Sequence, residues 1–514
     1  MSRLRSSIRW LLTPLLIVID RRIAWRSRPL DERMLRAERE LAGLQEYVRL
    51  VAGSLAPAPD TAPGETARPA TPVPANGAVP VPAPQASGRV EFTDRLACPV
   101  CRSQVQVVPE IVTADGRIKR GHVPCSRCEQ VVAQVRDFRV EFRARGGPIP
   151  EPAGPPRIVP AIGEIRLPFD DPRLCLNGGW TVWDGRFAVS HGSLADSLEY
   201  RGRFTDALVH LVTHVNGGVV DFFVDGRLTA TADLYSDHWF VLPFTIASDL
   251  PFEEHVLRIQ PRGTRNAAAK SPDVFVAELV LTGPQTDPGF EAPRPLNRGN
   301  AYIEVFERHI ARVPDGELIL EVGGGERRRL RRGYINLEYM TVECADVYGD
   351  IERLPFQDDT FSLVLTQAVF EHLANPHVAA AELIRVTRPG GTIVTDVAFM
   401  QPLHAAPYHY YNMTPWGAEE LFKSCTIVES DHYDGLASTI EWILRSVQAH
   451  TKVSERDFAD LVERVRAIEG KLSHSEIRAA ASGVWVVARK PVAGSGPGQP
   501  APAAAAAEDS IAAR

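Results

Sequence analysis

The sequence lacks a hydrophobic run long enough to cross a membrane. An apolar stretch at residues 10–19 is interrupted by Pro14, whereas a membrane-spanning helix needs about 20 apolar residues. Arg21 and Arg22 follow almost at once where a secretory signal would have a small-residue cleavage site, so no such signal is expected. These absences predict a cytoplasmic protein.

An excess of basic charge is also missing. The 57 Lys and Arg residues face 64 Asp and Glu residues, which leaves a net charge of −7. Without a global positive field, no nucleic-acid partner is expected. The first 30 residues are an exception, with seven arginines and one acidic residue. This segment is compatible with a peripheral contact on the inner face of the membrane, and equally with packing on a protein surface.

Disulfides are not expected, although the chain has seven cysteines. Four of them form two Cys-x-x-Cys pairs separated by 23 residues: Cys98, Cys101, Cys125 and Cys128. In a chain without a secretory signal, this spacing favours a metal. A redox Cys-x-x-Cys motif would leave the second pair unexplained. Because four thiolates leave no open coordination position, we expect a structural Zn²⁺ ribbon over residues 90–145.

Residues 1–55 are predicted to form a basic, helical leader. Apolar residues from Met34 to Leu55 alternate at four- and three-residue spacing, which is typical of a short heptad pattern. A weak homodimer through this helix and an intramolecular helix both fit the pattern. Residues 56–89 and 491–514 are rich in Pro and Ala, and we expect a disordered linker and a disordered tail there.

Residues 160–285 are predicted to form an all-β domain. Short alternating runs, such as residues 207–215 and 219–224, recur about every ten residues with turn signals between them. About eight strands in this length suit a β-sandwich or jelly roll. Glycan or partner binding is a hypothesis from fold analogy alone. His210 and His214 fall on one strand and one face, where we expect packed or surface histidines.

Strands alternate with helices from residue 300 to residue 490, which is typical of an α/β sheet. A strand at residues 317–322 ends in three consecutive glycines, 323–325. Glycines at such a point let backbone N–H groups approach a ligand. A second strand, residues 333–337, ends in Glu338, and an acid there can accept both hydroxyls of a ribose. This region is therefore predicted to bind a nucleotide-like cofactor.

The phrases that follow are more specific in combination. They are Asp350-Ile-Glu-Arg-Leu-Pro-Phe356, Glu371-His-Leu373 and Arg388-Pro-Gly-Gly391. In this order they resemble the class I S-adenosylmethionine-dependent methyltransferases of the UbiE, or type-11, family. The resemblance covers roughly residues 300–490 and implies a Rossmann-like fold, S-adenosylmethionine as cofactor and methyl transfer as activity. The cysteine pairs are similar to zinc ribbons that accompany some methyltransferases.

The resemblance also implies roles for individual residues at the methionine end of the cofactor. Glu321 would orient the methionine amino group. Gly323 and Gly325 would lie under the methionine and the ribose. Glu338 would hold the ribose hydroxyls.

At the other contacts, Asp350 and Ile351 would flank the adenine, and Gln367 would face the sulfonium.

The sequence departs from the family at Arg327, which replaces the third glycine of the loop. Residues 326–332 are also too short for the usual crossover helix and contain five arginines. The alternative is a degenerate methyltransferase domain in a non-catalytic scaffold that binds glycan or a partner.

Residues 398–414 follow a strand at residues 392–397 and are rich in His, Tyr and Asn. Ligands of open α/β sheets bind beyond the carboxyl ends of the strands. A neutral histidine can take up a hydroxyl proton at cellular pH, so His404 is the first candidate for a catalytic base and His409 the second. Bracing of the loop is the competing interpretation, and His372 is expected to be structural. The resemblance favours a sugar, polysaccharide or glycolipid hydroxyl as acceptor, with a quinone or small metabolite as alternative.

Overall fold

The computed structural model describes residues 92–142, 149–150, 154–299, 301–404, 408–448 and 454–492. The predicted leader and linker, and the tail from residue 493, lie outside these ranges, as do the dimer and membrane contacts predicted for the leader. Within the described ranges, no helix is both long and apolar enough to span a membrane.

The cysteine-rich region is a small antiparallel sheet. Strand β2 pairs antiparallel with β1 and β3, and β3 pairs with β4. A further strand, β5, adds to β1 in parallel. The elements are η1 (Thr93–Arg95), β1 (Val108–Thr113), β2 (Ile118–Cys125), β3 (Gln130–Arg136), β4 (Arg139–Glu141) and β5 (Arg157–Val159).

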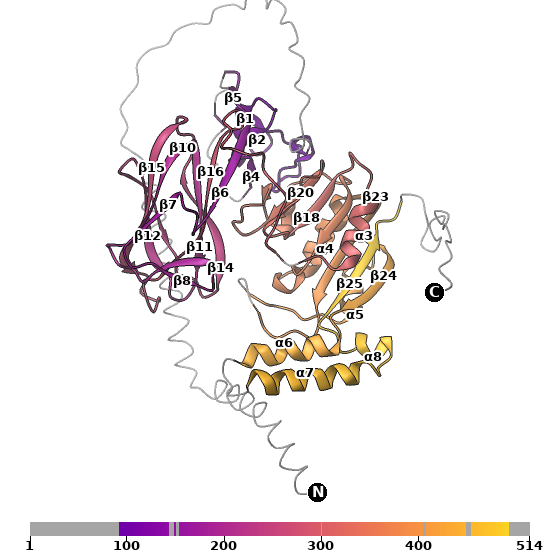
Figure 1. Cartoon of the computed structure of the whole chain (residues 1–514). Coiled ribbons are helices and arrows are strands. Elements are labelled where there is room, and N and C mark those ends of the chain that lie inside the picture. The colour runs from indigo at the N-terminus through magenta and orange to yellow at the C-terminus, as the bar shows by residue number, and fades with distance from the viewer. Residues whose placement is uncertain are drawn as a thin grey trace, which may run out of the picture. The chain divides into compact units, whose positions relative to one another are not determined.

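The predicted all-β domain is confirmed as two antiparallel sheets (Figure 1). One sheet has the order β13-β12-β15-β10-β7, and the other has the order β14-β11-β16-β9-β8, with β6 also paired to β16. Alternate side chains of both sheets share one core. The strands are β6 (Ile162–Pro168), β7 (Leu174–Asn177), β8 (Thr181–Trp183), β9 (Phe187–Ser190), β10 (Ser197–Phe204), β11 (Asp206–Thr213), β12 (Gly218–Val224), β13 (Arg227–Asp233), β14 (Phe240–Ala247), β15 (Glu253–Arg265) and β16 (Val274–Pro284).

The predicted Rossmann-like fold is confirmed by a sheet with the order β24-β25-β23-β22-β18-β20-β21. All neighbours from β21 to β23 are parallel, and β25 runs antiparallel between β23 and β24. The strands are β18 (Ile319–Val322), β20 (Tyr334–Glu338), β21 (Val347–Tyr348), β22 (Phe361–Thr366), β23 (Thr387–Ala398), β24 (Thr426–Tyr433) and β25 (Gly483–Arg489).

Helices cover both faces of this sheet, which explains why its strands are apolar throughout. Every residue of β18 and β20 is buried, as is typical of parallel strands covered on both faces. On one face, α3 packs over β18 and β22; on the other, α4 and α5 share a core with the same strands. The helices are α3 (Glu304–Arg312), α4 (Pro376–Val386), α5 (Pro415–Leu421), α6 (Leu436–Gln448), α7 (Glu455–Glu469) and α8 (His474–Arg478), with short turns η2 (Ile351–Arg353) and η3 (Phe370–His372).

The link between β18 and β20 contains no helix, as its length predicts. Instead, Arg327 and Arg328 form the short strand β19 (Arg327–Arg328), which pairs with β17 (Leu296–Asn297). The arginines of this link are used as structural cations. Arg331, for example, donates hydrogen bonds to the carbonyls of Val313 and Pro314 behind α3.

The ribbon continues the Rossmann-like sheet. Strand β4 pairs in parallel with β21, so the two sheets join into one of 12 strands. Ribbon side chains such as Leu96 and Val123 share a core with Leu320 and Phe356. Arg102 extends this contact, because its guanidinium donates to Glu382 on α4 at 2.8 Å. The ribbon therefore covers an edge strand that would otherwise expose unpaired backbone groups.

The β-sandwich contacts the Rossmann-like domain through buried charges. Glu343 accepts hydrogen bonds from Arg166 of the sandwich and from Arg328. Arg328 also donates to Glu164 of the sandwich at 2.8 Å. His210 faces Glu343 from β11 and is 1% exposed, so it is buried rather than a surface residue. His214 packs instead among aromatic rings.

Candidate functional site

A glycine loop follows β18, which lies between β20 on one side and β22 on the other. The chain passes from β18 to β20 and later returns from β21 to β22, so the strand order reverses at β18. Gly323 and Gly325 have φ values of +76° and +59°, which disfavour other residues. A Cβ on Gly323 would lie 2.4 Å from Val369 of the loop after β22, whereas a Cβ on Gly325 would meet open space. The loop is thus packed tightly at Gly323 and open at Gly325, where the resemblance places the ribose.

Glu338 lies at the carboxyl end of β20, beside this loop. The Gly325 N–H donates a hydrogen bond to its Oε1 atom. Burial raises the pKa of Glu338 to about 7, and the Gly325 N–H opposes that shift. The charges of Glu321 and Glu326 raise the pKa further, and Arg327 lowers it. The structure therefore brings Gly325 and Glu338 together, as the predicted ribose site requires.

Glu321 is enclosed in a network that the sequence analysis did not foresee. Its carboxylate accepts hydrogen bonds from Tyr302 and, at 2.8 Å, from Tyr334. Arg327 pairs with it at 3.0 Å and also donates to the carbonyl of Gly324. The Arg327 guanidinium lies 4.0 Å from the centre of the Tyr302 ring. The residue that replaces a loop glycine thus supplies a buried cation next to Glu321.

The two residues predicted to flank adenine have different surroundings. Asp350 is exposed and lines a cavity of about 490 Å³ together with Tyr339. Pro99 and Val100 of the ribbon line the same cavity. Ile351 is 6% exposed and belongs to the core. The structure therefore places only Asp350 at an open space beside the ribbon.

Gln367 follows β22 at the same end of the sheet. Its Nε2 donates to the carbonyl of Ala301 at 3.0 Å, and its buried Oε1 has no hydrogen-bond partner among the described residues. A cofactor contact at this position stays a prediction.

The loop after β23 brings His404 and His409 together. Their rings lie 4.5 Å apart, and His404 also faces His372 with ring centres 5.4 Å apart. His409 Nε2 contacts Asn412 Oδ1 at 2.8 Å, and its Nδ1 lies 3.2 Å from His404 Nδ1. Both ring nitrogens of His409 therefore contact other residues of the same loop, which favours a role in stabilising the loop over a role as catalytic base. The role of His404 as a base stays a prediction.

Two buried acids lie behind these histidines. Glu371 on η3 is 2% exposed and lies 3.8 Å from His404 Nε2. Asp396 on β23 accepts a hydrogen bond from the Ala368 N–H at 2.6 Å. Burial raises the pKa of Asp396 to about 8, and the charge of Glu371 raises it further. Glu371 was visible in the sequence only as part of the Glu-His-Leu phrase, and Asp396 gave no signal beyond lying on an apolar strand.

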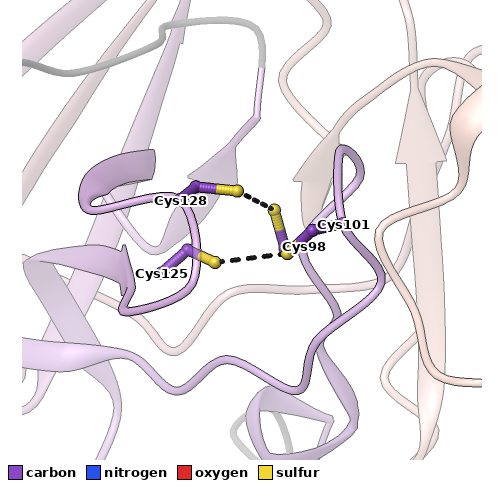
Figure 2. A group of neighbouring side chains, drawn as sticks. All are labelled: Cys98, Cys101, Cys125 and Cys128. Atoms are coloured by element: carbon purple, nitrogen blue, oxygen red, sulfur yellow. Dashed lines mark hydrogen bonds between the residues drawn. The ribbon is translucent and has the colours of Figure 1, made fainter.

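The four cysteines of the ribbon converge as their spacing predicts (Figure 2). The Sγ atoms of Cys98 and Cys128 lie 3.7 Å apart, and those of Cys101 and Cys125 lie 3.5 Å apart. These distances are too long for disulfides. Thiolates in a tetrahedral Zn²⁺ site with bonds of about 2.3 Å lie roughly 3.8 Å apart. The four residues thus fit a closed, structural metal site.

The knuckles that hold these cysteines share a backbone feature. Arg102 and Glu129, which directly follow the second cysteine of each pair, have φ values of +63° and +52°. This local reversal turns both cysteines of a pair toward the same centre.

Comparison with known proteins identifies the domain that contains the glycine-loop site. Residues 329–395 match the family described as a methyltransferase domain. An uncharacterized methyltransferase of Schizosaccharomyces pombe is 34% identical over 103 residues, which cover 19% of this chain and 37% of that protein. A demethylmenaquinone methyltransferase of Mycobacterium tuberculosis is 36% identical over 110 residues, covering 20% of this chain and 44% of that protein. The chain spans less than half the length of these curated relatives.

Solved structures overlap only weakly with the whole chain. A Haloferax volcanii complex between the Trm112 methyltransferase activator and a methyltransferase has a TM-score of 0.24 and 18% identity, and the match covers 36% of this chain and 88% of that one. A family two carbohydrate esterase from Cellvibrio japonicus has a TM-score of 0.21 and 12% identity, over 44% and 73% of the two chains. Scores this low support no conclusion about function.

The family match and the strand topology show that this chain carries an S-adenosylmethionine-dependent class I methyltransferase domain of the type-11 family.

Proposed function

We propose that the protein transfers a methyl group from S-adenosylmethionine to a hydroxyl group of a sugar, polysaccharide or glycolipid. The observation that carries the cofactor assignment is the pairing of open space at Gly325 with the buried carboxylate of Glu338. An acid at the end of the second strand accepts ribose hydroxyls in nucleotide-binding sheets. In the reaction, the methyl carbon–sulfur bond breaks while a carbon–oxygen bond forms, and the acceptor hydroxyl gives up its proton.

The acceptor class is supported by exposed aromatic side chains around the loop after β23. Tyr408, Tyr410 and Tyr411 are all exposed, and Trp416 on α5 is 78% exposed. Aromatic rings offer an apolar face, and tyrosines add a hydroxyl, a combination that suits a ligand with both apolar faces and hydroxyl groups. Trp442 of α6 packs against His404 and extends this surface toward the predicted acceptor position.

A quinone is the second candidate acceptor. It is favoured by the relatives named demethylmenaquinone methyltransferase, which share 36% identity with this chain over part of the domain. Mass spectrometry after incubation with S-adenosylmethionine and either demethylmenaquinone or unmethylated glycosides separates the two candidates. A methylated glycoside supports the first, and a methylated quinone the second.

Cofactor binding should depend on the charge of Glu338. Its pKa is raised to about 7, so its ionised form, the better acceptor for ribose hydroxyls, becomes populated as pH rises through 7. We expect the affinity for S-adenosylmethionine to increase between pH 6 and 8. Glu338→Gln should lower the affinity at pH 8 by roughly ten- to hundredfold, as loss of a charge-assisted hydrogen bond does, and should abolish the pH dependence. Calorimetric titration measures both effects.

The same group affects stability in the opposite direction. The pKa of Glu338 in the folded protein lies above its ordinary value, so ionisation of this group opposes folding. The contribution of Glu338 to the stability of the cofactor-free protein therefore falls as pH rises from its ordinary pKa of 4.5 to about 7. Glu338→Gln should therefore be no less stable than the parent at pH 8.

No heat of S-adenosylmethionine binding to the parent protein would contradict the proposed function and favour a degenerate domain in a binding scaffold.

A further inference from the structure

Three potential metal ligands converge beside the loop after β23. The Nε2 atoms of His404 and His372 lie 3.8 and 3.9 Å from Glu371 Oε1. The three ligand atoms all lie within 4.8 Å of one another. These separations are too long for hydrogen bonds. Ligand atoms of a tetrahedral Zn²⁺ site with nitrogen or oxygen donors lie roughly 3.4 Å apart, so the two separations from Glu371 are about 0.5 Å wider than those of a metal site.

The carboxylate of Glu371 lacks the partners that burial normally demands. Its side chain is 2% exposed, and its Oε2 atom has no hydrogen-bond partner among the described residues. Within the same part of the chain, its ion-pair contacts are with histidines alone. A buried carboxylate without hydrogen bonds or a cation is strongly unfavourable.

The two histidines are held in the tautomer that a metal requires. His372 Nδ1 lies 2.8 Å from the carbonyl oxygen of Tyr408, and His404 Nδ1 lies 3.1 Å from that of Pro402. Because a carbonyl can only accept, each Nδ1 must carry the proton. In the neutral form of each ring, the Nε2 lone pair therefore lies on the side of Glu371. A backbone carbonyl on the far nitrogen is the usual support of a metal-bound histidine.

The loop after β23, which carries His404, contacts η3, which carries Glu371 and His372. The N–H of Tyr410 donates to the carbonyl of Glu371 at 2.6 Å, which fixes the turn that carries two of the three ligands relative to the loop that carries the third. Two neutral imidazole nitrogens and a carboxylate oxygen that face one another repel unless a cation, either a metal ion or a proton on an imidazole, lies between them.

A second acid–histidine cluster in the same domain shows the contrast. Asp431 Oδ1 lies 2.8 Å from both His432 Nδ1 and His474 Nε2. These are hydrogen-bond distances, and His474 is 68% exposed. That cluster is already satisfied and provides a matched control.

We propose that Glu371, His372 and His404 bind one divalent transition-metal ion, with Zn²⁺ the best match. Two imidazoles and one carboxylate favour this class of ion over Mg²⁺ or Ca²⁺. Three protein ligands leave at least one coordination position open, as in catalytic sites. The ligand role replaces the roles expected from the sequence, a base for His404 and a structural residue for His372.

The acceptor part of this inference rests on the proposed function. An acceptor hydroxyl on the open position would have a lowered pKa and would release its proton to solvent water. The resulting oxygen would attack the methyl carbon, the carbon–sulfur bond would break, and the sulfonium would leave as the neutral thioether S-adenosylhomocysteine. His409, which is braced by Asn412, takes no part in these bonds.

The test is a Co²⁺ titration of the tag-free full-length protein with its ribbon cysteines saturated with Zn²⁺. We expect one equivalent of Co²⁺ with absorption bands of a nitrogen- and oxygen-ligated ion and without thiolate charge transfer. Glu371→Gln and His404→Ala should each weaken Co²⁺ binding by about a hundredfold or more. Loss of a residue that only hydrogen-bonds to a metal ligand typically weakens binding by about ten- to a hundredfold. His474→Ala should bind Co²⁺ like the parent protein.

Binding of no Co²⁺ by the parent protein would overturn the proposal, as would equal binding by the parent and both ligand variants. Loss of binding in His474→Ala alone would place the ion at the other cluster and also overturn it. Melting temperature and retained ribbon zinc show whether each variant is folded, and His404→Ala, at a part-exposed position, guards against misfolding of Glu371→Gln. Calorimetry with S-adenosylmethionine on the same samples separates failure of the metal site from failure of the proposed function.

Discussion

Removal of metal from the ribbon should destabilise the methyltransferase domain as well as the ribbon itself. Structural Zn²⁺ contributes about 10–16 kcal/mol of apparent binding free energy in small zinc modules. Here the module holds β4 against β21 and shares the core of the Rossmann-like sheet. We expect Cys98→Ser or chelation to lower the melting temperature of the whole unit by roughly 10 °C or more. Differential scanning calorimetry with metal analysis measures this change.

The same treatment should weaken cofactor binding. Pro99 and Val100, next to the predicted metal ligand Cys98, line the cavity that also contains Asp350. Loss of the knuckle would remove one wall of the predicted adenine site. The matched control is Cys175→Ser, because Cys175 is exposed in the sandwich and distant in sequence from the cluster. A parent-like melting temperature and affinity in the metal-free protein would show that the ribbon is only an appendage.

Glu343→Ala should be the most damaging single substitution at the contact between the sandwich and the methyltransferase domain. The Glu343 side chain is 4% exposed and faces Arg328, which is 7% exposed, at 2.5 Å. It also pairs with Arg166 across the contact. Removing one partner of a buried ion pair costs roughly 3–5 kcal/mol. Each arginine keeps a second carboxylate, Glu164 or Glu278, so we expect about 3 kcal/mol.

Chemical denaturation of the full-length protein measures this loss as a lower midpoint. Glu254→Ala is the control, because Glu254 pairs with Arg201 on the sandwich surface and both side chains are more than 60% exposed. Exposed pairs contribute about 1 kcal/mol or less. A similar, small effect of both substitutions would mean that the buried network does not hold the two domains together.

The sequence was sufficient for those features that depend on local spacing. Two Cys-x-x-Cys pairs predict four converging sulfurs because each pair needs only a local turn, and the structure brings them together at 3.5–3.7 Å. Buried apolar runs predict parallel strands, and the three glycines predict the loop after β18, which lies beside Glu338. The ribose contact of Glu338 stays a prediction. The alternating runs of the β-domain likewise correspond to observed strands.

The sequence was insufficient where function depends on contacts between distant residues. Arg327 looked like a defect in a glycine motif, yet it is the buried cation beside Glu321. His372 looked structural, yet its Nε2 faces Glu371 together with His404, which lies 32 residues further along the chain. The side chain of Ile351 packs in the core, and its expected contact with adenine stays a prediction.

The sequence by itself determined the class of fold, the glycine loop and the convergence of the four cysteines, because each follows from residue periodicity or from a motif a few residues long. Tertiary structure alone decided that the ribbon completes the methyltransferase sheet, that buried charges join the sandwich to it, and that two histidines share one carboxylate. These features arise when strand pairing and burial bring distant polar groups out of water. Their partners are then fixed by the geometry of the packed chain, which no local pattern encodes.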